Sequence, residues 1–214
     1  MVFSTVALSE ILKPTDDPCQ VEPEGSYPIM GIYGFARGPI TRTAVRGSEI
    51  SATTLYRVRK GQLVYSRLKA FEGAYTVVPP ELDGYFTSNE FPTFDVDANR
   101  ADHRYLEWLF RQPEVWREIA IGSKGIGARR ERVHPRQVLS YRISLPSLDE
   151  QRRIVKRLDM VAALVADRRR AIEAALSDRD RVVEARGGRE IREPVRDVQR
   201  RELRQTLRVD ADRD

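Results

Sequence analysis

The chain has 214 residues, of which 41% are hydrophobic and 32% are charged. This length suits one domain with an appendage and excludes a large multidomain protein, and the apolar clusters that recur over roughly the first 185 positions exclude disorder along the whole chain. Lysine and arginine number 37 against 32 acidic residues, a net charge of +5 that favours an anionic partner.

The N-terminal stretch Met1–Leu8 is mildly apolar, but no basic residues precede it and Ser9 and Glu10 interrupt it, so we expect no signal peptide. No apolar run approaches the roughly 20 residues of a membrane-spanning helix, and we therefore expect a cytoplasmic protein. Cys19 is the single cysteine, which excludes an intramolecular disulfide and a thiolate metal cluster. We interpret it as a small, reduced side chain.

Residues 1–146 hold most of the aromatic, glycine and proline residues, and short apolar runs between turn residues predict strands there. The expected strands are Ile29–Tyr33, Gln62–Arg67, Tyr75–Val78, Tyr85–Ser88 and Tyr141–Ser144. The second and third are joined through Phe71-Glu72-Gly73, which is typical of a hairpin, and Asp83-Gly84 predicts another turn.

One helical stretch, from Asp102 to about Ala120, interrupts these strands, because its apolar residues follow the helix period. Pro113 should restart this helix, since proline is tolerated in a first turn and not in a helix interior. Few of the strands are separated by full helices. We therefore predict an α+β fold for a domain spanning residues 1–146.

A second zone, residues 147–187, begins at a capping box formed by Ser147 and Glu150. No glycine or proline follows until Gly187, which predicts one long helix. Its apolar residues recur in alternating steps of four and three, as in a coiled coil. This seam comprises Ile154, Leu158, Val161, Val165, Ile172, Ala175 and Val182, with Arg168 and Arg179 at two positions where apolar residues are expected.

The third zone, residues 188–214, follows Gly187-Gly188 and alternates basic and acidic residues with few apolar ones. This composition is typical of a solvated, partly disordered tail.

Residues that could catalyse a reaction are sparse. His103 and His134 have no cysteine or carboxylate at metal-ligand spacing, so we predict no metal site. The acidic residues Glu81, Asp83, Glu90, Asp95 and Asp97 lack the lysine that follows in the common nuclease motif. The glycine-rich segment Gly122–Gly127 lacks the spacing of a phosphate-binding loop, and no methyltransferase motif is present. We expect a protein without catalytic activity or cofactor.

The same glycine-rich segment is the best candidate for a binding site. Small residues let backbone N–H groups approach a phosphate, and arginine can contact guanine through two hydrogen bonds. The candidate DNA-binding residues are Lys124, Arg129, Arg130 and Arg132 in this segment, with Arg67, Lys69, Arg42 and Arg46 before it. Strand alternation would place Arg67 and Lys69 on one face. An ordinary surface loop with solvated arginines is the alternative.

Several segments resemble, in order, the specificity subunits of type I restriction–modification systems. Tyr65–Ala74 and Ser88–Phe94 are similar to motifs of their target-recognition domains, and the glycine-rich segment running into Arg129–Val133 is similar to the stretch before the last strand. Leu145–Val155 resembles the junction between that domain and the family's long helix. The resemblance extends over roughly residues 6–175, an ordered series more specific than any single motif.

The resemblance implies a non-catalytic subunit that binds double-stranded DNA. It would direct an adenine methyltransferase subunit and a translocating restriction subunit to a bipartite target, with the helix docking the methyltransferase.

The chain departs from this family in having one recognition domain and one helix where members usually have two. Self-association through antiparallel seams would supply the missing half by symmetry, as a homodimer or as a pair with another half-subunit. A further alternative is that the chain is a truncated, inactive remnant. Two readings from other classes remain, namely a stand-alone dimeric DNA-binding regulator and an RNA-binding protein that uses Gly122–Gly125 as a backbone clamp.

Overall fold

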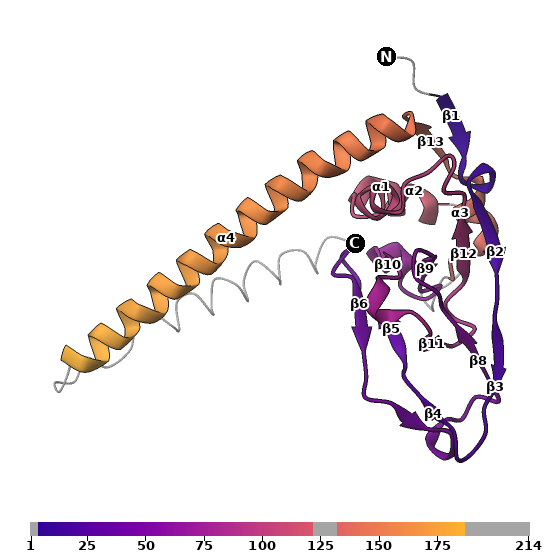
Figure 1. The fold of residues 1–214 in the computed structure, drawn as a ribbon, viewed down its shortest axis with the longest axis horizontal. Coiled ribbons are helices and arrows are strands. Elements are labelled where there is room, and N and C mark those ends of the chain that lie inside the picture. Colours follow the sequence, from indigo (N-terminus) through magenta and orange to yellow (C-terminus); the bar gives the residue numbers. More distant parts are fainter. Residues whose placement is uncertain (1–3, 122–131, 187–214) are drawn as a thin grey trace, which may run out of the picture. The chain divides into compact units, whose positions relative to one another are not determined.

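The structure is a computed structural model that describes residues 4–121 and 132–186. Strand β1 (Ser4–Ala7) pairs antiparallel with β13 (Arg142–Leu145), the last strand before the long helix α4 (Leu148–Arg186) (Figure 1). Val6 lies opposite Ile143 in this pair, and both side chains are buried. The pairing therefore fixes the N-terminal strand beside the start of α4.

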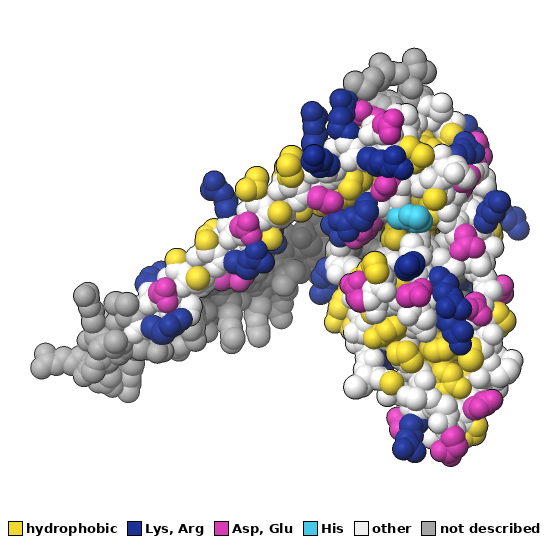
Figure 2. Space-filling view, in the orientation of Figure 1, with side chains coloured by type: hydrophobic (Ala, Val, Ile, Leu, Met, Phe, Trp, Pro, Cys, Tyr) yellow, Lys and Arg dark blue, Asp and Glu magenta, His cyan; other side chains and the backbone are white. Residues whose placement is uncertain are grey.

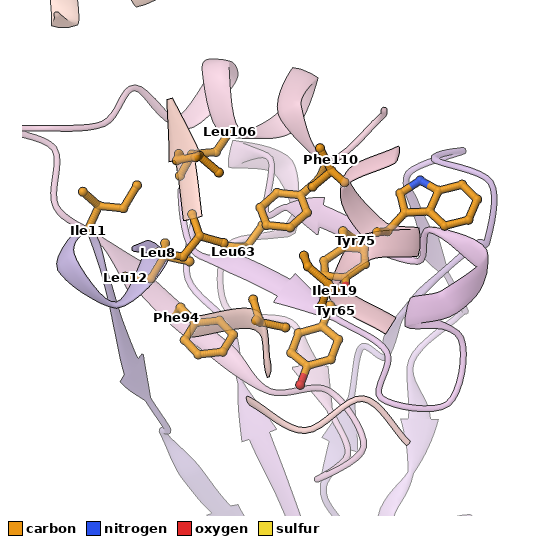
Figure 3. Close-up of a cluster of buried hydrophobic side chains, with 14 of the residues drawn as sticks. Leu8, Ile11, Leu12, Leu63, Tyr65, Tyr75, Phe94, Leu106, Phe110 and Ile119 are labelled. Carbon is orange, nitrogen blue, oxygen red and sulfur yellow. The ribbon is translucent and has the colours of Figure 1, made fainter. Parts of the chain in front are cut away.

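The largest sheet has four antiparallel strands in the order β10-β9-β12-β2. Their bounds are β2 (Leu12–Thr15), β9 (Leu63–Tyr65), β10 (Tyr75–Val77) and β12 (Thr93–Val96). A stack of aromatic rings runs across this sheet from Phe94 through Tyr65 and Tyr75 to Phe110, with neighbouring ring centroids 6.2, 5.3 and 4.7 Å apart (Figure 3). These rings form the centre of the main hydrophobic core.

Three helices complete the same core: α1 (His103–Leu109), α2 (Pro113–Ala120) and α3 (Pro135–Ser140). The Asp102 carboxylate caps α1 by accepting hydrogen bonds from the backbone N–H groups of Arg104 and Tyr105. Pro113 is the first residue of α2, so the predicted restart is confirmed. Helix α3 was not predicted, because its six residues are too few to show a helical period.

The remaining strands are short and form three further antiparallel groups. Strands β3 (Pro18–Gln20), β8 (Thr54–Arg57) and β11 (Phe86–Thr87) form a three-stranded sheet. Two ribbons pair β4 (Ser26–Tyr27) with β7 (Val45–Arg46) and β5 (Met30–Ile32) with β6 (Pro39–Thr41). The 3-10 helices are η1 (Leu8–Glu10), η2 (Gly47–Glu49), η3 (Ala70–Glu72) and η4 (Pro80–Leu82).

The α+β prediction is confirmed, and a strand lies within or overlaps each of the five predicted segments. Eight other strands are present among the described residues and were not predicted, because their positions depend on pairing with distant segments. The expectation that strand alternation places Arg67 and Lys69 on one face is wrong. Strand β9 ends at Tyr65, so Arg67 and Lys69 belong to the turn that follows it and do not alternate along a strand.

Helix α4 begins as predicted, but its capping box is only half formed. Ser147 Oγ accepts a hydrogen bond from the Glu150 N–H at 3.4 Å, whereas the Glu150 carboxylate pairs with Arg153. One compact unit runs from Met1 to Asp159 and therefore includes the first turns of α4, where Gln151 and Val155 are buried. The predicted tail after Arg186 lies outside the described residues.

The second unit begins at Met160. Along α4 in this unit, Val161, Val165 and Ile172 of the predicted seam are exposed, as are Met160, Leu164 and Leu176. Figure 2 shows hydrophobic side chains, in yellow, among charged ones along this helix. Among the described residues, no helix is long and apolar enough to cross a membrane.

Candidate nucleic-acid interface

The turn between β9 and β10, residues Ser66–Gly73, joins several distant segments of the chain. The Arg67 N–H donates to the Glu90 carbonyl at 2.9 Å, and the Arg67 carbonyl accepts from the Val133 N–H at 3.0 Å. The Tyr65 hydroxyl, at the end of β9, donates to the Val133 carbonyl at 2.9 Å. Residues 90 and 133 are thus fixed beside a turn that carries two of the predicted cations.

Gly73 closes this turn in a left-handed conformation, with φ of +74°. A Cβ at this position would lie 2.6 Å from Nε1 of Trp116, so only glycine fits. Trp116 belongs to α2, the helix that ends just before the glycine-rich segment. The turn is therefore packed directly on that helix.

Arg132 is attached to this turn by an ion pair. Its guanidinium lies 2.9 Å from Oε1 of Glu90, which the backbone already holds beside Arg67. The other oxygen, Glu90 Oε2, and the Nε of Arg67 are buried without a hydrogen-bond partner among the described residues. Two oppositely charged groups are thus incompletely satisfied at the same place, a pattern that occurs at binding sites.

A cleft of about 250 Å³ opens beside the turn. Its walls combine apolar side chains, among them Phe91, with polar ones that include Arg57, Arg67, Asn89 and Asp17. The Arg57 guanidinium stacks at 5.2 Å over the ring of Phe86, which fixes its position. The cleft therefore presents two arginines and an amide from three separate segments of the first unit.

The predicted DNA-binding residues divide into three groups in the structure. Arg67, Lys69 and Arg132 come together around the Ser66–Gly73 turn, with Lys69 and Arg132 exposed and Arg67 half-buried. Arg42 follows β6, and Arg46 pairs with Ser26 across the β4–β7 ribbon, so neither is connected to the turn by those contacts. Lys124, Arg129 and Arg130 lie outside the described residues.

Charge alone does not locate an interface on the visible face of the molecule. On the face shown in Figure 2, lysine and arginine side chains are interspersed with acidic ones. The turn is distinguished by its connections and not by a basic patch. Sequence reasoning considered Glu90 only as part of an incomplete nuclease motif and missed its pairing with Arg132, because contacts between distant loops leave no periodic signal.

Sequence reasoning also missed the loop Tyr33–Gly38, which is attached to the same turn. The Phe35 N–H donates to the Glu72 carbonyl at 2.5 Å, and the Ala36 N–H to the Gly73 carbonyl at 3.2 Å. Its sequence, Tyr-Gly-Phe-Ala-Arg-Gly, combines two glycines with two aromatic residues. That combination was a usable signal for an exposed, tightly turned loop.

The two histidines and the acidic side chains were the candidates for a metal site. Among the described residues, no three histidine, cysteine, aspartate or glutamate side chains are grouped for this purpose. His134 is the residue before α3, where its N–H donates to the side chain of Gln137, and His103 lies against Gly61. Neither histidine is paired with a carboxylate in these contacts.

No family model matches the sequence, and no curated protein matches it significantly. Solved structures do match. The crystal structure of the HsdS subunit from Thermoanaerobacter tengcongensis is 21% identical with a TM-score of 0.68, over 89% of this chain and 51% of that one. A second match is a chain from a structural study of complex assembly and conformational transition of the type I R-M system. It is 21% identical with a TM-score of 0.66, over 89% of this chain and 52% of that one.

The S subunit of the type I restriction–modification system from M. genitalium is more distant, at 12% identity and a TM-score of 0.51, over 85% of this chain and 45% of that one. This chain shares the fold of these subunits and spans about half their length. The resemblance drawn from the sequence motifs is therefore confirmed at the level of the fold.

Proposed function

We propose, from the fold shared with type I specificity subunits, that this chain is a sequence-specific DNA-binding subunit of a restriction–modification system. The observation that carries the proposal is the assembly of Arg67, Lys69 and Arg132 around one rigid turn of a domain with that fold. Cations on a fixed backbone suit phosphate contacts and base contacts in a groove.

In this proposal the chain is not an enzyme, and chemistry belongs to its partners. An adenine methyltransferase subunit would modify the target, and a restriction subunit would cleave unmodified DNA. The first unit, Met1–Asp159, would act as the recognition domain and read one half of a bipartite target. Which of the arginines reach bases and which reach phosphates depends on the bound geometry.

The exposed seam of α4 supports the second part of the proposal, which concerns assembly. The apolar side chains of Val161, Val165 and Ile172 are exposed on this helix. Packing against a second helix would remove them from water and so lower the free energy of the assembled form. A second copy, or another half-subunit, would bring a second recognition domain and thus a second half-site. Part of the same helix would dock the methyltransferase.

A map of adenine methylation across the host genome, with the gene present and deleted, tests this function. Single-molecule sequencing should show one split motif losing its methylation on deletion, and an inverted-repeat motif would indicate a homodimer. Unchanged methylation at every motif would contradict the proposal. The full chain should also co-purify with a methyltransferase, whereas a chain that binds DNA alone would be a regulator.

A further inference from the structure

The loop between β5 and β6 holds a bulky side chain in an unusual backbone conformation. Phe35 and Ala36 both have positive φ, +59° and +52°, a region that residues with a side chain seldom adopt. Such conformations persist only where the surrounding structure imposes them, and they gather at functional sites.

Three hydrogen bonds impose this conformation. The Tyr33 N–H donates to the Gly38 carbonyl at 3.0 Å and closes the loop, while residues 35 and 36 donate to the carbonyls of Glu72 and Gly73. Buried Met30 and Ile32 hold the base of the ribbon against the body of the domain. The loop is thus fixed at its base and at its tip.

This rigid loop places its aromatic residue in solvent. The Phe35 side chain is 67% exposed, and those of Tyr33 and of Phe71 in the neighbouring turn are 41% and 45% exposed. A phenylalanine in a strained conformation that buries little of its ring does not serve the folded domain alone. The conformation instead presents the ring to a binding partner.

The charges around the tip favour a polyanion as that partner. Arg37 stacks over the Tyr33 ring at 4.6 Å and donates to the Gly34 carbonyl, so a guanidinium is fixed within the loop. Lys69 is exposed in the turn that holds the loop. The acidic residue of that turn, Glu72, is half-buried against Gly34, where a Cβ would lie 3.1 Å from its Oε2.

The shape of the element suits a DNA groove. Strands β5 and β6 form a separate two-stranded antiparallel ribbon, and the major groove of B-DNA admits such a ribbon. An apolar ring at the tip could pack against thymine methyl groups or the faces of partly unstacked bases, while the adjacent cations contact phosphates.

We propose that the loop Tyr33–Gly38 enters the groove of the target duplex and that Phe35 contacts the bases there, making it a specificity-determining residue. This inference rests on the proposed function and adds the element that discriminates between sequences. It predicts that Phe35 contributes to sequence preference, and that Lys69 contributes to affinity for any duplex.

The test uses the full chain and a duplex that it selects from a random-sequence library. Phe35→Asn removes the ring but keeps a residue that tolerates positive φ, and Phe35→Trp keeps an aromatic ring. We expect Phe35→Asn to bind the selected duplex about tenfold more weakly and an unrelated duplex unchanged. Phe35→Trp should stay close to wild type, and Lys69→Ala should weaken binding to both duplexes alike.

Equal binding of wild type and Phe35→Asn to the selected duplex would overturn the inference and leave the proposed function intact. Weakened capture of a methyltransferase by Phe35→Asn, with DNA binding unchanged, would overturn it too and assign the loop to a protein contact. A wild-type chain that prefers no sequence would contradict the proposed function itself. Unchanged thermal unfolding of Phe35→Asn serves as the control for folding.

Discussion

The side chain of Gln151, in the first turn of α4, accepts a hydrogen bond from the backbone N–H of Asp102 at 2.8 Å. The same amide donates to the carbonyls of Arg100 and Pro146 at 2.9 and 2.8 Å, so both of its N–H groups and its oxygen are used. Gln151 is 0% exposed. The residue before α1, which caps that helix, is thereby tied to the start of the long helix.

Replacing Gln151 by alanine should destabilise the first unit by about 3 kcal/mol, because one buried and two part-buried backbone groups would lose their partner. Gln151→Glu should be at least as damaging, since a carboxylate would face two carbonyl oxygens. Urea unfolding followed by circular dichroism measures the loss. Arg152→Ala, next in the chain on the exposed side, is the matched control and should change the free energy of unfolding by less than about 0.5 kcal/mol. Equal stability of the two variants would refute this account of the junction.

The stacked tyrosines of the core should make the protein sensitive to alkali. Burial raises the pKa of Tyr65 and of Tyr75 well above the ordinary value of 10, with the nearby Arg67 opposing the shift for Tyr65. A pKa raised by folding contributes stability below about pH 10 that is lost as the pH rises toward the folded value. We expect constant stability from neutral pH to about pH 9, and above pH 10 a fall that coincides with the tyrosinate absorbance.

Tyr75→Phe provides a matched test of this explanation. The Tyr75 hydroxyl is buried without a hydrogen-bond partner among the described residues, so its removal should not lower stability at neutral pH. It should reduce the loss of stability above pH 10 by removing one of the tyrosines whose pKa burial raises. A variant with the same alkaline transition as wild type would show that other groups drive it.

The seam of α4 predicts how the chain associates. Replacing Leu158 and Val165 by glutamate should convert an associated form to a monomer while the first unit keeps its fold, because charges would enter the apolar contact. Ala163 is exposed on the opposite side of the helix, so Ala163→Glu is the control and should leave association unchanged. Sedimentation velocity distinguishes these outcomes, and a monomeric wild type would remove the basis for the pairing.

Sequence reasoning located the elements with a strong periodic signal or a strong local signal. The proline at the start of α2, the β9–β10 hairpin and the long helix were of this kind, and each is present. The strands that were missed depend for their positions on pairing with distant segments, which leaves no local signal.

For the candidate site, single residues could be predicted from the sequence, but their grouping could not. Arg67 and Lys69 were identified from their motif, and Arg132 from the basic segment. Their grouping depends on Glu90, which no spacing rule connects to residue 132. The aromatic tip at Phe35 was missed because its exposure follows from the hydrogen bonds of Glu72 and Gly73, which lie over thirty positions away in the printed sequence.

The ion pair between Arg132 and Glu90 should affect how tightly the chain binds DNA. A phosphate that binds Arg132 must compete with Glu90, so Glu90→Gln should tighten DNA binding about threefold at low salt by removing the competing charge. Arg132→Ala should weaken binding and lower the slope of log affinity against log salt concentration by about 0.9, the effect of one lost phosphate contact. Fluorescence anisotropy across a series of salt concentrations measures both.

Arg111 offers a matched control, because it too is paired with a glutamate, Glu107 at 2.6 Å, but lies on α1 and has no contact with the turn in that pair. Arg111→Ala should leave the salt slope unchanged. If Arg132→Ala and Arg111→Ala lower the slope alike, the effect comes from net charge and not from a phosphate site at the turn. If neither lowers it, Arg132 makes no phosphate contact, and its pairing with Glu90 is structural.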